Sequence, residues 1–324
     1  MKLIVTCTHL IRHLDDFSNL LKEAGIEFKA YQPKNQQFSY LEMLDLLPGN
    51  DFIIAGDDVI NEKVIKKSIS KGLKAIIKWG IGVDNIDKGA AKKNNIPIFN
   101  TPNVFGGDVA EQALSMILNL SRGTHIIDRE VRKGNWLKIE GNSLIDKKLG
   151  IIGFGSIGKS IAERAYAFGM EISFYDPFFR KEFSYSNNFF NLGFEDLCKN
   201  SDFIVIACSL NKNNIHLINK NSIELMDKKP FIINVSRGPI INEKDLIEAI
   251  KEKQIKGAGL DVFEDEPHPI HSELIKMNNC ILGSHNSSNT YEAVKRVNRL
   301  TIEMVIELVS KKNNLDLFKE RRVI

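Results

Sequence analysis

The 324-residue sequence lacks the features that define secreted, membrane and nucleic-acid-binding proteins. Its four cysteines lie far apart without CxxC spacing, which argues against a disulfide framework and a zinc site. No apolar run approaches the roughly 18 residues of a membrane span, and three apolar residues near the amino terminus are too few for a signal peptide. A net charge of +3 is far below the excess that phosphate-backbone binding needs. We therefore expect a cytoplasmic protein without nucleic-acid, membrane or metal partners.

What the chain does contain is a regular alternation. Short runs rich in Ile, Val and Phe alternate with longer Lys- and Glu-rich stretches of helical period, which is typical of βαβ units and a parallel sheet. One series precedes residue 100 and a second spans residues 149–282, with a break at 101–107. We expect an α/β protein with two parallel-sheet domains.

Three local expectations concern helix and chain ends. Asp108, followed by Glu111, predicts a capping box at the start of a helix after the break. A helical stripe over residues 294–308 is expected to pack back on the first unit. The closing residues 319–324 are expected to be a frayed, solvated end.

The string Ile151-Ile-Gly-Phe-Gly-Ser-Ile-Gly-Lys-Ser160 satisfies two phosphate-binding patterns. As GxGxxG, Gly153 makes a tight turn, Gly155 lets a pyrophosphate approach the backbone, and Gly158 lets helix and strand pack closely. As GxxxxGK[ST], the same segment is a nucleotide-binding P-loop. A glycine turn without a ligand is the third alternative.

Asp176 favours the dinucleotide interpretation. It lies 23 residues after Gly153 (176 − 153 = 23), at the end of the next predicted strand, where a carboxylate can accept both hydroxyls of an adenosine ribose. The same charge would repel a 2′-phosphate, which favours NAD over NADP, although the nearby Arg180 weakens this preference.

Three candidate chemical groups follow three later strand-like runs. Arg237, then Asp261 and Glu266, then His285 each lie just beyond such a run. In an open parallel sheet, side chains beyond the carboxyl ends of the strands face the ligand crevice. The pattern therefore gathers an arginine, a carboxylate and a histidine near one ligand.

Together these motifs resemble the D-isomer-specific 2-hydroxyacid dehydrogenases, particularly the short, phosphoglycerate dehydrogenase-like form without a regulatory domain. The similarity extends from Trp79-Gly-Ile-Gly-Val-Asp-Asn-Ile-Asp87, through Val109-Ala-Glu111 and Gly134-Asn-Trp136, to His285. It implies that an NAD-binding Rossmann domain (101–289) is inserted into a flavodoxin-like substrate-binding domain (1–100 and 290–324). It also implies a homodimer and hydride transfer between NAD and C2 of a D-2-hydroxyacid or 2-keto acid.

The resemblance also assigns roles to residues. His285 matches the catalytic acid/base, Glu266 its carboxylate partner, and Arg237 the residue that holds the substrate carboxylate and reacting oxygen. Asp261 matches a ligand of the nicotinamide carboxamide, and Lys78, Gly80, Ile81 and Gly82 match substrate-binding positions. The implied cofactor-binding set is Ile81, Gly153, Gly155, Ser156, Ile157, Gly158, Asp176, Cys208, Val235, Ser236 and Asp261.

The substrate and the activity remain open at this point. Lys78 could bind a second anionic group such as the phosphate of 3-phosphoglycerate, whereas Asp57 and Asp58 would oppose a phosphate if they face it. Ser284 and Asn286, which flank His285, depart from the family pattern of a preceding proline and a following apolar residue. A P-loop nucleotide-binding protein and a catalytically silent NAD-binding sensor are the alternatives.

Overall fold

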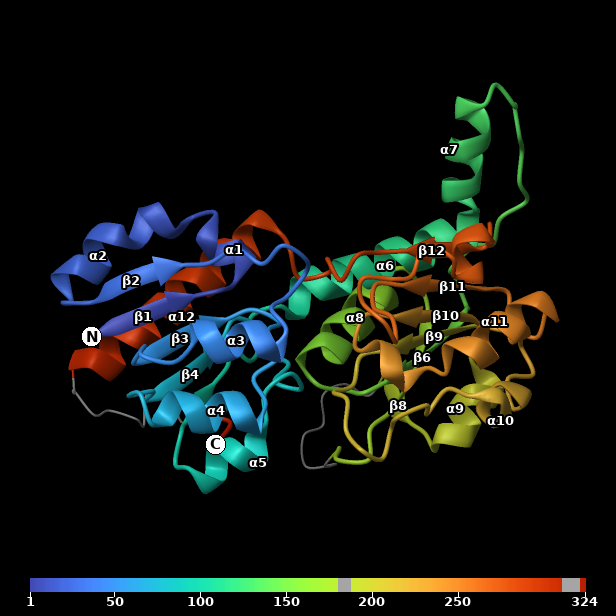
Figure 1. Ribbon diagram of the computed structural model, residues 1–324. Coiled ribbons are helices and arrows are strands. Elements are labelled where there is room, and N and C mark those ends of the chain that lie inside the picture. The colour runs from blue at the N-terminus through green and yellow to red at the C-terminus, as the bar shows by residue number, and fades with distance from the viewer. Residues whose placement is uncertain (180–187, 311–320) are drawn as a thin grey trace. The chain divides into compact units, whose positions relative to one another are not determined.

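The computed structural model describes residues 1–179, 188–310 and 321–324. The chain divides into two compact units, Met1–Val104 with Thr290–Ile324, and Phe105–Asn289. Each unit is an α/β structure built on one parallel sheet, and Figure 1 labels their elements.

The sheet of the first unit has the strand order β2-β1-β3-β4-β5, which is the flavodoxin-like order. Every strand pair in it is parallel. Because helices cover both faces, the central strands are apolar runs buried throughout rather than alternating ones. The strands are β1 (Lys2–Val5), β2 (Glu27–Ala30), β3 (Phe52–Ala55), β4 (Ala75–Lys78) and β5 (Ile98–Phe99).

Side-chain caps fix where the helices of this unit begin. Ser39 and Glu42 form a capping box at the start of α3, and Asn61 and Asp87 accept from the first-turn N–H groups of α4 and α5. The apolar faces of these three helices and the sheet form one core cluster. The helices are α1 (Thr8–Ile11), η1 (Leu14–Phe17), α2 (Ser18–Glu23), α3 (Tyr40–Leu46), α4 (Glu62–Ile69), α5 (Lys88–Lys93) and α12 (Tyr291–Ser310).

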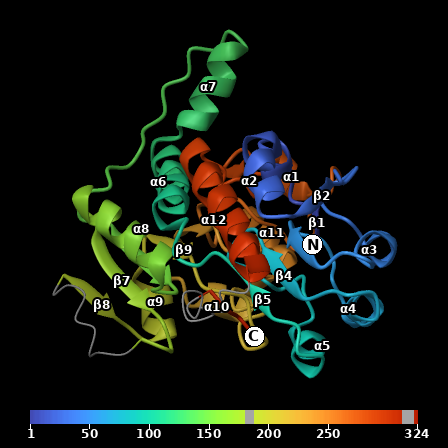
Figure 2. The ribbon, with the colours of Figure 1, turned by 90° about the vertical axis from the view of Figure 1, so that its left-hand side faces the viewer.

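The carboxyl-terminal helix α12 returns to the first unit, as the sequence predicted. It packs on α1 and β4, an arrangement visible in Figure 2. Trp79 Nε1 donates a hydrogen bond to Asn298 Oδ1 at 2.7 Å, which ties the end of β4 to the helix. The predicted frayed end is wrong for residues 321–324, because Val323 N donates to Ile98 O at 2.8 Å and Arg322 pairs with Phe99 beside β5.

The sheet of the second unit has the order β12-β11-β10-β9-β6-β7-β8. With β6 as the first strand, the six strands from β8 to β11 follow the Rossmann order 3-2-1-4-5-6. All neighbouring pairs are parallel, so the carboxyl ends share one edge. The strands are β6 (Lys148–Ile152), β7 (Glu171–Tyr175), β8 (Phe189–Asn191), β9 (Phe203–Ile206), β10 (Phe231–Asn234), β11 (Gly257–Leu260) and β12 (Cys280–Leu282).

Helices cover both faces of this sheet as well. Helix α6 packs on α8 and on the strands β10, β11 and β12, whereas α9 packs on β6 and β7 beside α10. Helices α10 and α11 contribute to the apolar cluster with the sheet. The helices are α6 (Gly106–Arg122), α7 (Thr124–Arg132), α8 (Ser156–Ala167), α9 (Phe194–Asn200), α10 (Lys220–Glu224), η2 (Gly238–Ile240), α11 (Glu243–Lys251) and η3 (Glu273–Lys276).

The expected capping box at Asp108 is wrong. Helix α6 begins at Gly106 with Phe105 as its N-cap, so Asp108 lies inside the first turn. A Cβ at position 106 would lie 2.7 Å from Ser156 Oγ, so close packing against α8 explains why glycine begins this helix. Asp108 still complements the positive end of the helix dipole.

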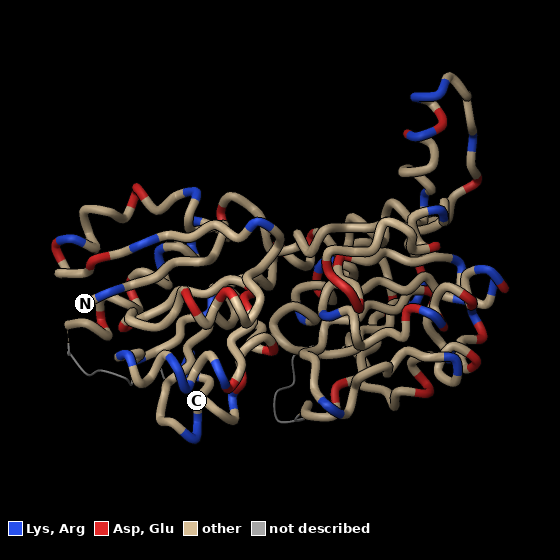
Figure 3. The backbone as a smooth tube through the Cα atoms, viewed as in Figure 1, with Lys and Arg blue, Asp and Glu red and all other residues tan. Residues whose placement is uncertain are grey.

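Charge is distributed without a dominant sign, as Figure 3 shows for the backbone positions of basic and acidic residues. Over the described part of the chain, no helix is long and apolar enough to cross a membrane. In the same residues, no group of three or more His, Cys, Asp or Glu side chains could hold a metal ion.

Candidate active site

The glycine turn follows β6 at the point where the strand order reverses. Gly153 has φ +94°, and a Cβ there would lie 2.6 Å from the backbone of Cys208. A Cβ at Gly158 would overlap with Gly153 O, so both glycines are required by the packing of the protein itself. A Cβ at Gly155 would meet no atom within 4 Å. Glycine at 155 therefore leaves open space, as expected where a phosphate approaches the N-terminus of α8 at Ser156 and Ile157.

Asp176 lies at the end of β7 and contacts the glycine turn directly. Its Oδ2 accepts from Phe154 N and its Oδ1 from Phe178 N, each at 2.9 Å. Each carboxylate oxygen can accept a further hydrogen bond, so the side chain is oriented and still able to bind ribose hydroxyls. The structure thus fits the predicted dinucleotide site, while Arg180 lies outside the described residues.

Cys208, Val235 and Ser236 form adjoining loops after β9 and β10. Ser236 Oγ donates to Cys208 O at 2.5 Å, which joins the two loops. Burial raises the pKa of the Cys208 thiol to about 11, against an ordinary value of 9.0. This cysteine is therefore suited to forming a wall and not to acting as a nucleophile.

The Arg237 loop is held by Asn234, a residue that the sequence analysis missed. Asn234 is fully buried; its Oδ1 accepts from Ser236 N and its Nδ2 donates to Arg237 O, both at 3.0 Å. A Cβ at Gly238 would overlap with the backbone of Phe263, so the loop after β11 lies directly against this one. The available signal was a polar residue closing an otherwise apolar strand.

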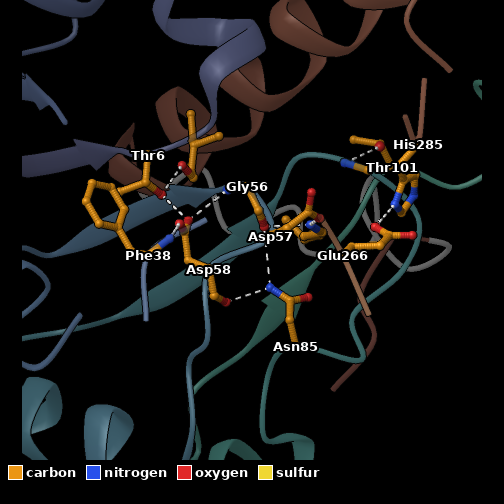
Figure 4. A network of polar contacts seen from close by, with 12 residues as sticks. Thr6, Phe38, Gly56, Asp57, Asp58, Asn85, Thr101, Glu266 and His285 are labelled. Atoms are coloured by element: carbon orange, nitrogen blue, oxygen red, sulfur yellow. Dashed lines mark hydrogen bonds and ion pairs between the residues drawn. The ribbon is translucent and has the colours of Figure 1, made fainter. Parts of the chain in front are cut away.

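Glu266 and His285 form a hydrogen-bonded pair, and Figure 4 shows their side chains pointing toward each other. His285 Nδ1 lies 2.7 Å from Glu266 Oε2, and Phe263 N donates to Glu266 Oε1 at 3.0 Å. The side chain of His285 is 30% exposed and that of Glu266 is 22% exposed, so the pair is reachable from solvent and still partly desolvated. An ionised carboxylate can only accept, so Nδ1 carries the proton and Nε2 is the ring nitrogen turned away from Glu266.

The backbone of His285 is in the left-handed region, with φ +54°. For a residue with a Cβ this conformation costs about 1–2 kcal/mol. Asp261 holds this backbone through hydrogen bonds. Its carbonyl oxygen accepts from His285 N at 2.7 Å, and its carboxylate accepts from Asn286 N at 3.1 Å and from Ser287 N at 2.8 Å. Ser287 Oγ donates to the same carboxylate. These contacts go beyond the nicotinamide contact that the family resemblance implies for Asp261.

The loop Gly80–Gly82 follows β4 in the first unit. Gly80 N already donates to Thr101 Oγ1 at 3.2 Å, and Ile81 O accepts from Asn100 Nδ2 at 2.8 Å. Within the described ranges, no acceptor takes the N–H groups of Ile81 or Gly82. Two adjacent backbone donors of this kind can bind a carboxylate, so the predicted anion site is reduced from three donors to two.

Lys78, at the end of β4, is paired inside the first unit. Its Nζ lies 2.7 Å from Asp57 Oδ1 and 2.5 Å from Gly56 O, and its side chain is only 4% exposed. Asp58 is buried separately and accepts from Thr6 Oγ1, Phe38 N and Gly56 N. Desolvation raises the pKa of Asp58 despite these donors. The positive charge of Lys78 is therefore balanced by Asp57.

A Rossmann sheet, a glycine turn contacted by an acidic residue, and an acid–histidine pair beyond adjacent strands define a dinucleotide-dependent oxidoreductase. Comparison with known proteins makes the class specific. Residues 114–287 match the family model described as "D-isomer specific 2-hydroxyacid dehydrogenase, NAD binding domain". The chain belongs to this family, and NAD is its cofactor.

Individual relatives act on different acids. A hydroxypyruvate reductase of Thermotoga maritima is 36% identical over 86% of this chain and 87% of its own. A D-3-phosphoglycerate dehydrogenase of Methanocaldococcus jannaschii is 34% identical over 90% of this chain, which spans 55% of that relative's length. The structure of a D-lactate dehydrogenase from Aquifex aeolicus with NAD and lactic acid superposes with a TM-score of 0.86, at 26% identity, over 100% of this chain and 99% of that one.

Proposed function

We propose that this protein catalyses reversible hydride transfer between NAD and C2 of a small D-2-hydroxyacid or 2-keto acid, with Arg237, Glu266 and His285 as its catalytic residues. The observation that carries the proposal is the 2.7 Å contact between Glu266 Oε2 and His285 Nδ1 beyond the carboxyl ends of β11 and β12. In a Rossmann sheet this edge is where the ligand binds.

The bound cofactor supplies the hydride acceptor in one direction and the hydride donor in the other. His285 Nε2 removes the hydroxyl proton during oxidation and returns it to the carbonyl oxygen during reduction. Glu266 holds the ring in one tautomer and stabilises the imidazolium that forms. The Arg237 guanidinium binds the substrate carboxylate and favours negative charge on the reacting oxygen. Within the first unit, the Ile81 and Gly82 N–H groups are two adjacent donors that suit an anion.

Asp176 gives the cofactor preference. Its carboxylate is fixed by two backbone N–H groups at the end of β7, where it supports hydrogen bonds to a ribose and repels a 2′-phosphate. We therefore propose that the enzyme prefers NAD to NADP and that Asp176→Ala reduces this preference. A wild-type enzyme that prefers NADP would contradict this role.

The ion pair between Lys78 and Asp57 bears on the substrate tail. A phosphate at this position would meet a pair with no net charge instead of an isolated cation. This favours a small acid without a second charged group, such as glyoxylate or hydroxypyruvate, over 3-phosphoglycerate. The proposal predicts a higher kcat/KM for unphosphorylated 2-keto acids than for phosphorylated ones.

One experiment tests the function directly: NADH consumption by the purified protein with a panel of 2-keto acids, phosphorylated and unphosphorylated. His285→Ala should lower kcat by about 10²–10⁴-fold while changing NADH affinity little, because proton transfer is lost and the cofactor pocket stays. NADH binding without turnover of any acid would indicate an NAD-binding sensor instead. An unchanged rate in His285→Ala would refute the acid/base assignment.

We also propose a homodimer formed through the second unit, in the cytoplasm. Helix α7 buries none of its residues and projects from the rest of its unit in Figure 1. Val131, Trp136 and Leu137 expose 43%, 82% and 39% of their surface, an apolar group that a partner could cover. The four cysteines are free thiols, which suits a reducing compartment. Sedimentation at the 36.6 kDa mass of one chain would refute the dimer.

A further inference from the structure

The loop that carries His285 has an unusual conformation for its sequence. His285 lies in the left-handed region with φ +54°, which only a few per cent of residues other than glycine adopt. Such a backbone persists when the surrounding structure fixes it, and residues of this kind cluster at functional sites. The residue that fixes it here is Asp261, which is 1% exposed and follows β11.

Among the described residues, every hydrogen bond of the Asp261 side chain is made to the residues just after His285. Oδ1 accepts from Asn286 N at 3.1 Å, while Oδ2 accepts from Ser287 N at 2.8 Å and from Ser287 Oγ. The Asp261 carbonyl accepts from His285 N at 2.7 Å. Asp261 therefore binds three consecutive backbone N–H groups, from residue 285 to residue 287, and so determines the direction in which the His285 side chain leaves the chain.

The chemistry requires a carboxylate at this position. Both oxygens accept from backbone donors, whereas an asparagine would place an NH₂ group against one of those N–H groups. Two donors that face each other in a buried site, the asparagine NH₂ group and a backbone N–H group, leave both without an acceptor, which is unfavourable. The loop that carries His285 would therefore have to move. Gly283 is part of the same design, because a Cβ there would overlap with Asp261 Oδ1.

From these contacts we infer that Asp261 is a positioning residue that holds His285 in the orientation that meets Glu266. The inference rests on the proposed function for its kinetic consequences, but the geometry it concerns exists without substrate. It adds a role to the nicotinamide contact that the family resemblance implied for Asp261, because that contact alone would not require the side chain to bind residues 286 and 287.

The test replaces Asp261 by Asn and measures three quantities. We expect kcat to fall about 10- to 100-fold, since a displacement of about 1 Å at a catalytic group has effects of this size. The NADH dissociation constant, from fluorescence titration, should change less than about threefold. In the ligand-free protein, the NMR titration midpoint of the His285 ring should move to lower pH, because a ring that leaves Glu266 loses the carboxylate that stabilises its charged form.

Two further variants cover the case in which Asp261→Asn does not fold. Gly283→Ala displaces the carboxylate without removing it and should reproduce the same three changes. Ser287→Ala removes the hydroxyl donor and keeps the backbone N–H, so kcat should fall by only about 2- to 10-fold.

Asp202→Asn is the matched control. Asp202 lies in the same unit at the amino end of β9, where its Oδ2 accepts from Lys148 N at 3.0 Å and its side chain is 17% exposed. This variant loses a comparable carboxylate and should leave kcat and the His285 titration unchanged.

An unchanged His285 titration together with strongly weakened NADH binding in Asp261→Asn would overturn the inference and leave Asp261 as a cofactor ligand. Equal shifts in Asp202→Asn would also overturn it, because the effect would then be general. Absence of turnover in the wild type would contradict the proposed function, and the NMR measurement would still decide the role of Asp261.

Discussion

Replacing Glu266 by Gln isolates the charge of the acid–histidine pair from its geometry. Glutamine has the same length, and its carbonyl oxygen can still accept from His285 Nδ1, which lies 2.7 Å from Glu266 Oε2. Phe263 N, which donates to Oε1 at 3.0 Å, would face the amide NH₂ group unless the amide rotated. Glutamine has only one side-chain oxygen, so we expect this oxygen to accept from either His285 Nδ1 or Phe263 N. The negative charge of the side chain is lost with either partner.

The size of the effect follows from the separation and the exposure. Two unit charges about 4 Å apart attract by about 1–4 kcal/mol at effective dielectric constants of about 80 to 20. The side chains are 30% and 22% exposed, so solvent screening places this pair in the lower part of that range. A loss of about 1–2 kcal/mol in stabilisation of the imidazolium corresponds to a rate decrease of about 5- to 30-fold.

The assay is the pH dependence of keto-acid reduction at saturating NADH. Reduction needs protonated His285, so a less stable imidazolium moves the alkaline limb of the profile to lower pH as the rate falls. Glu264→Gln is the matched control: Glu264 lies two residues away and its Oε1 contacts His216 Nε2 at 2.5 Å instead. A Glu266→Gln profile that superposes on the wild type, or an equal shift in Glu264→Gln, would refute the reasoning.

Three other predictions concern the two units separately. Gly153→Ala should lower the melting temperature, because φ is +94° and the added Cβ meets Cys208. Gly155→Ala should preserve the melting temperature and weaken NADH binding about tenfold or more. Thermal unfolding measures the first effect and fluorescence titration the second. Burial, with Arg12 and Lys78 nearby, lowers the pKa of His9, so the unfolded chain binds the proton more tightly and stability falls as pH drops through the ordinary value of 6.5. Urea unfolding at about pH 7.5 and about pH 5.5 should show a smaller pH dependence in His9→Phe. Burial also raises the pKa of every free thiol, to about 11 for Cys208 and Cys280 and to about 12 for Cys7 and Cys198. A disulfide reagent at about pH 8 should therefore label the native protein about a hundredfold or more slowly than the unfolded protein. Rapid labelling of the native protein would contradict this prediction.

The fold class and the contact between the glycine turn and Asp176 could be predicted from residue patterns alone. Apolar strand runs separated by helical stretches predicted the two parallel sheets, and both are present. The glycine turn and Asp176, 23 residues apart, are in direct contact through Phe154 N. These features can be predicted from the sequence because strand burial, tight turns and dinucleotide binding each require particular residue types at short, fixed spacing.

The pairing of groups that lie far apart in the chain could not be predicted from the sequence. The sequence predicts opposing effects of Lys78 and Asp57 on a bound phosphate, whereas in the structure the two side chains form an ion pair. Asp261 binds a loop 24 to 26 residues further along, and Asn234 shapes the Arg237 turn from a fully buried position. The residue type determines which hydrogen bonds a side chain can donate or accept. Its partner depends on strand order and loop packing, because a buried polar group bonds to a group that the fold brings within about 3 Å.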